Sequence, residues 1–173
     1  GQEDNGRYLK WQLSCEGVDV SAVKTDPKRL TAMVLLSIRG DNDFPLIQYR
    51  ENCADMGLTA EDIDPDYLAR AGAVLVTGTH LSREGVRSAT MKVLETAKRL
   101  GLKCILDIDF RPNLWGLQGH DAGSSRWAEA SERVTAEYKK ALPYFDLIVG
   151  TEEEFFIAGG KTEAMEALRE VRR

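Results

Sequence analysis

The chain has 173 residues, 43% hydrophobic and 29% charged, which is enough to bury the core of one domain and excludes a wholly disordered protein. A formal net charge of -5 argues against a nucleic-acid partner, because nucleic-acid-binding domains usually carry a basic surplus. No apolar run reaches the length of about 18 residues that a membrane span needs, so no membrane partner is expected. The three cysteines lie far apart and form no C-x-x-C pattern, which favours a reducing compartment, and we expect the cytoplasm.

The first third of the chain predicts a helix followed by a β-hairpin. Apolar residues recur at helical spacing over residues 5–16, and Gly17 can end that helix. Residues 30–39 and 44–50 are rich in strand formers and flank a turn cluster at residues 40–43. Pro45 lacks the donor of a central strand, so its strand should lie at an edge.

From residue 64 onward, short apolar strands alternate with helices. This alternation predicts an α/β fold with a parallel sheet, and ligands of such sheets bind beyond the carboxyl ends of the strands. The predicted strands are residues 73–77, 103–107 and 146–149, and the predicted helices are residues 65–71, 82–100, 126–142, 152–158 and 162–172.

The most informative segment follows the second of these strands, in the sequence LDIDFRPNLW at residues 106–115. Asp107 and Asp109 share one side of the strand if the extended conformation persists. Arg111 stands two residues further on and can bind an anion. The alternative is a charged loop in which Arg111 merely pairs with one of these aspartates.

A second arginine, Arg50, ends the predicted hairpin in the sequence QYREN. Such a residue is often only a solvated charge at a sheet edge. Together with Arg111, however, it would form a pair of guanidinium groups suited to a carboxylate or phosphate.

Two further segments follow strand ends. Thr151 and Glu154 form the Thr-x-x-Glu pattern of a capping box that starts a helix, and helix starts at strand ends also gather phosphates and Mg²⁺. Gly78 and His80 follow the first strand of the sheet. A site role for His80 is open, but the simpler interpretation is a surface histidine.

At these residues the chain resembles the ribokinase-like (PfkB-type) sugar kinases. The segments YRENCADMGL, VTGTHLS, LDIDFRPNLWGL and LIVGTEEEF occur in that family's order, and the resemblance covers essentially the whole chain. It implies a three-layer α/β sandwich with a mostly parallel sheet and a small β lid. The whole chain would then be part of one domain, with lid strands at about residues 20–54, βα units at about residues 64–173 and no second domain.

The same resemblance implies roles for individual residues. Arginines at these positions contact the substrate acid in the family, and the glutamate of the motif after the third strand helps to organise Mg²⁺ and phosphates. Thr151 replaces the asparagine more usual in that motif, which puts a direct contact by its side chain in doubt. The implied substrate-binding residues are Tyr49, Arg50, Asp109 and Arg111, and the implied nucleotide and Mg²⁺–phosphate residues are Thr151 and Glu154, with Glu154 acting on the metal through water.

The implied activity is ATP-dependent phosphorylation of a keto-deoxy sugar acid, with ATP and Mg²⁺ as the cofactors. LIVGTEEEF together with YRENCAD favours 5-dehydro-2-deoxy-D-gluconate, converted to its 6-phosphate in inositol catabolism, and 2-keto-3-deoxygluconate is the alternative substrate. The expected partners are therefore the small sugar acid and ATP, together with a second subunit bound through the lid strands as a homodimer.

The family's catalytic aspartate stands in a Gly-Ala-Gly-Asp signature, and this sequence contains no such tetrapeptide. We therefore expect an interior piece of a kinase that has no catalytic base and, taken alone, little or no kinase activity.

Two other classes of function fit parts of the pattern. Asp107-x-Asp109 after an apolar strand is also how haloacid-dehalogenase-type phosphatases begin, although Arg111 and Pro112 do not match that family's motif. A non-catalytic module that binds a sugar acid or a partner protein is the other alternative.

Overall fold

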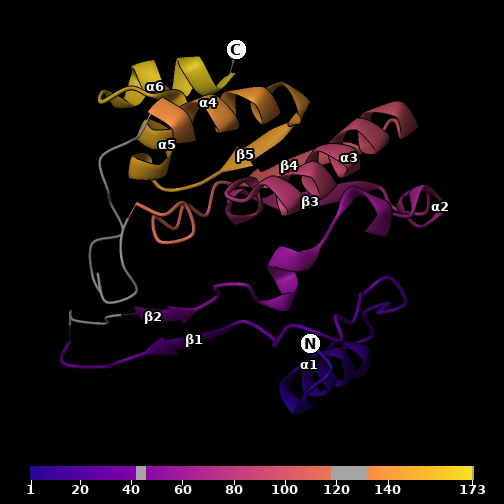
Figure 1. Cartoon of the computed structure of the whole chain (residues 1–173). Coiled ribbons are helices and arrows are strands. Elements are labelled where there is room, and N and C mark those ends of the chain that lie inside the picture. Colours follow the sequence, from indigo (N-terminus) through magenta and orange to yellow (C-terminus); the bar gives the residue numbers. More distant parts are fainter. Residues whose placement is uncertain (42–45, 118–131, 173) are drawn as a thin grey trace.

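The chain is arranged as a helix and a small antiparallel sheet on one side and a set of alternating strands and helices on the other (Figure 1). A computed structural model describes residues 1–41, 46–117 and 132–172. The strands are β1 (Met33–Leu36), β2 (Leu46–Tyr49), β3 (Ala73–Thr77), β4 (Lys103–Asp107) and β5 (Leu147–Val149). The α-helices are α1 (Asp4–Cys15), α2 (Pro65–Leu68), α3 (Glu84–Leu100), α4 (Glu132–Ala141), α5 (Glu152–Gly159) and α6 (Ala164–Arg172). Short 3₁₀ turns are η1 (Ala54–Gly57), η2 (Ala60–Asp62), η3 (Gly78–Leu81) and η4 (Leu142–Tyr144).

The larger sheet is parallel, with strand order β3-β4-β5. Thr77 of β3 pairs with Asp107 of β4, which in turn pairs with Val149 of β5. The three strands therefore end level with one another, and the segments that follow them start from one edge of the sheet. The alternation of strands and helices predicted from the sequence is confirmed, and with it the α/β class.

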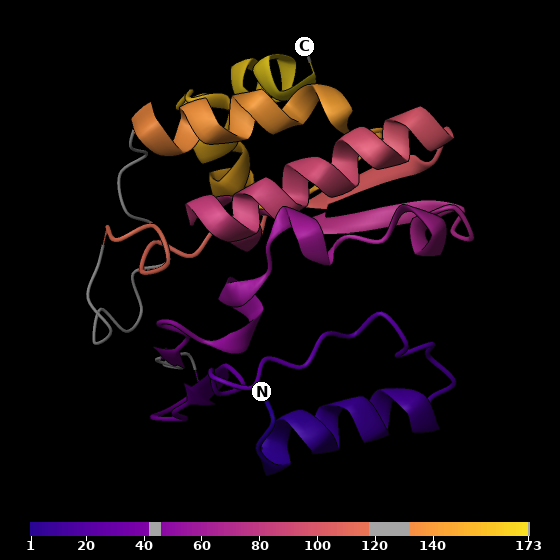
Figure 2. The ribbon, with the colours of Figure 1, turned by 45° about the vertical axis from the view of Figure 1, so that its right-hand side comes forward.

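One face of this sheet carries the core. Alternate strand residues point to that face and pack beneath α3 and α4 (Figure 2). Buried residues of the core cluster include Val74, Val76, Leu94, Cys104, Leu106, Ile108, Phe110, Val134 and Tyr138. Burial of such a cluster is the main favourable contribution to the stability of a domain of this size.

The opposite face of the sheet is open among the described residues. Leu75 in β3 is 67% exposed, and Leu147 in β5 is 53% exposed. No described helix thus covers this face, where the resemblance implied helices on both faces of the sheet.

Helix boundaries follow local signals. Gly101 ends α3 with φ +73°, a left-handed conformation that glycine adopts without a steric penalty. The helix predicted from residue 82 begins at Glu84 instead, because Arg83 is extended and η3 occupies the preceding residues. Residues 126–131 of the helix predicted after β4 lie outside the described residues.

The predicted hairpin is also present. β1 and β2 pair antiparallel, Met33 with Tyr49 and Leu36 with Leu46, and both strands are shorter than the sequence suggested. This pair, here called the lid, lies apart from the larger sheet on the side of α1 (Figure 1). Residues 42–45 of its turn, with Pro45, lie outside the described residues. Within the described ranges, no helix is both long and apolar enough to cross a bilayer.

Candidate functional site

The residues that directly follow β3 and β4, Gly78 and Ile108, pack closely against each other at the edge of the sheet. The Tyr138 hydroxyl of α4 donates a 2.8 Å hydrogen bond to the Ile108 carbonyl. A Cβ added to Gly78 would overlap both the Ile108 carbonyl oxygen and this hydroxyl, so a glycine is required where β3 ends. Burial raises the pKa of Tyr138, which therefore stays a neutral donor to this carbonyl.

The loop after β4 turns sharply at Asp109. Ile108 still donates to the Val149 carbonyl at 2.9 Å, but Asp109 has φ +36°, in the left-handed region that aspartate tolerates better than most residues. The extended conformation therefore stops before Asp109. Because side chains alternate in this way only along an extended strand, Asp107 and Asp109 need not lie on one side. Asp109 is instead half-buried and forms an ion pair with Arg111.

Arg111 is held at three points. Besides Asp109, its guanidinium donates to the Phe110 carbonyl at 2.9 Å and lies 3.9 Å from Glu154 Oε1. The pairing of Arg111 with its own aspartate, which the sequence left as an alternative, is thus present. It does not remove the guanidinium from the site edge, because the Arg111 side chain remains 28% exposed.

Glu154 joins two of the loops. It is 5% exposed, and its Oε1 accepts a 2.9 Å hydrogen bond from the Phe110 backbone while its Oε2 accepts another of 2.9 Å from the Thr151 backbone. The Thr151 hydroxyl in turn accepts from the Glu154 backbone at 3.4 Å, which completes the predicted capping box of α5. The loops after β4 and β5 are therefore fixed to each other by one carboxylate.

Arg50 approaches the same region from the lid. Its Nη2 and Nε donate to one oxygen of Asp55, Oδ2, at 2.6 and 3.1 Å. The other oxygen, Asp55 Oδ1, is buried without a hydrogen-bond partner. Both residues also line a cavity of about 820 Å³ between α1, residues 22–34 and η1.

His80 lies within electrostatic reach of Arg50, Asp55 and Asp109. It is half-buried in η3. The sequence left a site role for His80 open beside the simpler interpretation of a surface histidine, and in the structure its exposure is intermediate. The signal for a site role was its place directly after a strand of the parallel sheet.

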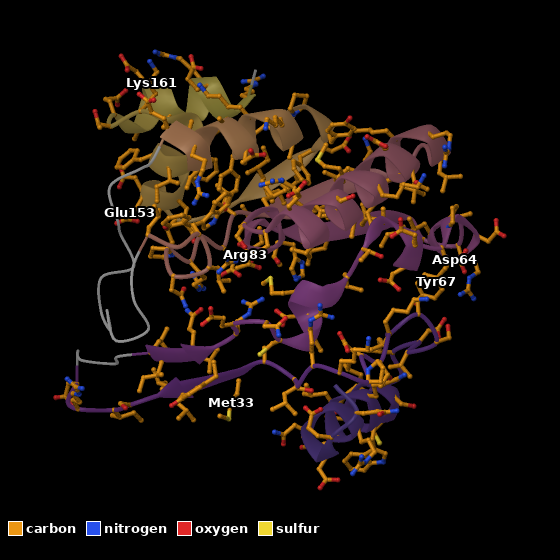
Figure 3. All side chains as sticks on the ribbon, viewed as in Figure 1. Met33, Asp64, Tyr67, Arg83, Glu153 and Lys161 are labelled. Carbon is orange, nitrogen blue, oxygen red and sulfur yellow. The ribbon has the colours of Figure 1, made fainter. Side chains whose placement is uncertain are left out.

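The two remaining residues predicted from the sequence, Tyr49 and Thr151, are exposed in the structure. Tyr49 is 52% exposed at the end of β2, and Thr151 serves the helix cap described above. Figure 3 shows Glu153, which neighbours the buried Glu154, on the outer side of α5.

A direct metal site does not form among the described residues. They contain no cluster of three or more histidine, cysteine or acidic side chains that could hold a metal ion. Both oxygens of Glu154 accept backbone hydrogen bonds, from Phe110 and from Thr151.

The comparisons with known proteins agree on one family. The model of the "pfkB family carbohydrate kinase" matches residues 1–172. A relative from Geobacillus kaustophilus, a 5-dehydro-2-deoxygluconokinase, is 33% identical over 151 residues, which are 87% of this chain and 41% of the relative. The chain thus spans less than half of the length of that relative.

Solved structures share the fold. A PfkB protein from Polaromonas sp. JS666 superposes with a TM-score of 0.81 at 22% identity, over 99% of this chain and 54% of that one. An uncharacterized sugar kinase from Pyrococcus horikoshii, solved in complex with ATP, gives a TM-score of 0.75 at 24% identity, over 95% of this chain and 50% of that one. Because this family match covers residues 1–172, the alternative of a haloacid-dehalogenase-type phosphatase is set aside. The chain belongs to the pfkB family of carbohydrate kinases.

Proposed function

We propose that this chain is the lid and sheet-edge portion of an ATP-dependent kinase that phosphorylates 5-dehydro-2-deoxygluconate on its terminal hydroxyl. The observation that supports this substrate most strongly is the 33% identity to the relative named 5-dehydro-2-deoxygluconokinase. The related sugar kinase solved with ATP supports ATP as the phosphoryl donor.

The charges at the site are consistent with an acidic substrate. Arg50 and Arg111 come from the lid and from the loop after β4, and each is paired with an aspartate. An incoming carboxylate can take over guanidinium N–H groups that these aspartates hold, so the site is prepared for an anion without leaving an arginine unpaired. In this proposal Asp109 and Tyr49 contribute polar contacts beside the two arginines.

The contribution of these residues to the reaction is positioning. When Arg50 and Arg111 hold the sugar acid, its terminal hydroxyl can be aligned with the phosphoryl group of ATP. Such alignment supplies a large part of the rate enhancement of phosphoryl transfer. Glu154 fixes the loop that carries Arg111 and is proposed to act on Mg²⁺ only through water.

The substrate is tested by measuring ADP release from the full-length protein with each of the two keto-deoxygluconates. Turnover of the 5-dehydro-2-deoxy acid with a higher kcat/KM supports the proposal. Preference for 2-keto-3-deoxygluconate would instead assign the alternative substrate, and turnover of neither acid would overturn the proposed function.

Arg111→Ala tests the proposed anion contact. Loss of a charge-assisted hydrogen bond should raise KM for the acid by about 10- to 100-fold, whereas KM for ATP should change little. Arg111→Lys retains the positive charge but not the two parallel N–H donors of the guanidinium, so its KM for the acid should lie between those of the wild type and Arg111→Ala. An unchanged kcat/KM in a folded Arg111→Ala protein would show that Arg111 does not contact the substrate.

A further inference from the structure

His80 is a polar side chain without an assigned task at the edge of the sheet. It lies in η3, directly beyond β3, and is half-buried. Its imidazole makes no hydrogen bond to any described residue, although Thr77, Thr79 and Ser82 around it are bonded to one another. The side-chain hydrogen bonds of this turn therefore do not involve the imidazole.

The groups that face His80 come from both halves of the site. Arg50 and Asp55 approach from the lid side, and Asp109 approaches from the loop after β4. Burial is the main cause that lowers the pKa of His80 below its ordinary value, and the positive charge of Arg50 lowers it further, whereas the two aspartates oppose this change. The imidazole of the ligand-free protein is therefore predominantly neutral near neutral pH.

A neutral imidazole offers one N–H donor and one acceptor nitrogen. Of the residues whose charge acts on His80, Asp55 has a buried oxygen, Oδ1, without a hydrogen-bond partner. The unpartnered oxygen of Asp55 and the imidazole of His80, which makes no hydrogen bond to a described residue, are thus available to the hydroxyl and carboxylate groups of a polyhydroxy acid. An anionic ligand would also favour the charged form of His80 by simple attraction.

We propose that His80 is a substrate-contacting residue of this site, donating a hydrogen bond to the bound sugar acid and taking up a proton from solvent as the acid binds. The inference rests on the proposed function, because it needs an anionic sugar acid between Arg50 and Arg111. The net change is one proton moved from water to an imidazole nitrogen, with no covalent bond made or broken in the ligand.

The sign of the pH dependence follows from this linkage. The pKa of His80 is lower in the free protein than in the complex, so the acid binds most tightly at low pH and more weakly as pH rises through the value in the complex.

The experiment is calorimetric titration of the full-length protein with 5-dehydro-2-deoxygluconate, without ATP, in two buffers of different ionisation enthalpy. The wild type should take up a measurable fraction of a proton, and its affinity should fall as pH rises from about 6 to 8. His80→Gln keeps a polar side chain but cannot titrate, so it should bind about tenfold more weakly at the lower pH, with neither proton uptake nor pH dependence.

Three results can be distinguished. Loss of proton uptake in a folded His80→Gln protein that retains its KM for ATP supports the inference. Acid binding by the wild type without proton uptake, or unchanged uptake in His80→Gln, overturns the role of His80 and leaves the proposed function intact. Failure of the wild type to bind or phosphorylate either keto-deoxygluconate overturns the proposed function, and the inference about His80 with it.

Discussion

At the scale of single residues, the buried carboxylate of Glu154 is the strongest connection between the site loops. Its two oxygens accept from the Phe110 and Thr151 backbones, and its side chain is nearly inaccessible to water. A carboxylate that accepts backbone N–H groups in such a place is difficult to replace, because an amide would turn a donor toward a donor.

Glu154→Gln should therefore lower the free energy of unfolding by about 1–3 kcal/mol, the cost of an unsatisfied buried group. Urea denaturation measures this change. Glu153→Gln is the matched control, since Glu153 is exposed in the same turn of α5, and it should change stability by at most about 0.5 kcal/mol. Equal effects of the two substitutions would contradict the role assigned to Glu154.

Gly78 is the second residue whose identity is dictated by its contacts. Gly78→Ala would force its Cβ into the Ile108 carbonyl and the Tyr138 hydroxyl, and should destabilise the protein by about 1–3 kcal/mol. Thermal unfolding is a suitable measurement. Gly72→Ala is the control, because nothing lies within 4 Å of a Cβ added there, and a loss as large as that of Gly78→Ala would refute the steric argument.

At the scale of elements, Asp146 joins three of them at the end of the sheet opposite the site. The carboxylate at the start of β5 accepts from the Cys104 backbone at 2.9 Å, from Lys103 at 2.9 Å and from Lys98 of α3 at 3.2 Å. The backbone hydrogen bond from Cys104, followed by the bonds from Lys103 and Lys98, lowers the pKa of Asp146. The contribution of this carboxylate to folding should therefore depend on pH.

Because the folded-state pKa of Asp146 is lower than its unfolded-state value, the stabilisation is present above about pH 4 and is lost as pH falls through the folded-state pKa. The melting temperature of Asp146→Asn should lie below that of the wild type near neutral pH, and the difference should shrink in acid. Glu95→Gln, an exposed change on α3, should track the wild type throughout. A gap that stays constant from neutral pH to acid would contradict this origin.

The lid is the element least able to stand alone. A two-stranded sheet is marginally stable in water without a covered face, and here Leu36 is 56% and Ile38 76% exposed. Its open edges and apolar faces are what a second copy of the chain would cover, which is the basis of the homodimer that we propose.

At the scale of the whole molecule, this dimer is testable by light scattering coupled to size-exclusion chromatography. The wild type should elute as a dimer, and Leu36→Lys combined with Ile38→Lys should shift it toward the monomer, because lysine at a buried apolar contact is unfavourable. Leu168→Lys, an exposed apolar position on α6, is the control and should leave the dimer intact. A monomeric wild type would exclude the lid interface.

The sequence by itself determined the order and type of the elements. Strands β3 and β4 have the predicted ends, α3 and α5 end at glycines, and Thr151 with Glu154 forms the predicted capping box. These features depend on side chains a few residues apart, through periodicity, propensity and caps, and such local relations can be read directly from the order of residues.

The tertiary structure alone decided how the site is assembled. Four features of the site were not predicted from the sequence: the bond from Phe110 to Glu154, the pairing of Arg50 with Asp55, the left-handed turn at Asp109, and the position of His80 near Arg50, Asp55 and Asp109. The bond from Phe110 to Glu154 and the position of His80 near Arg50, Asp55 and Asp109 join segments that are far apart in the sequence. No local pattern encodes where such segments meet, because only the packing of the sheet and the lid brings them within reach.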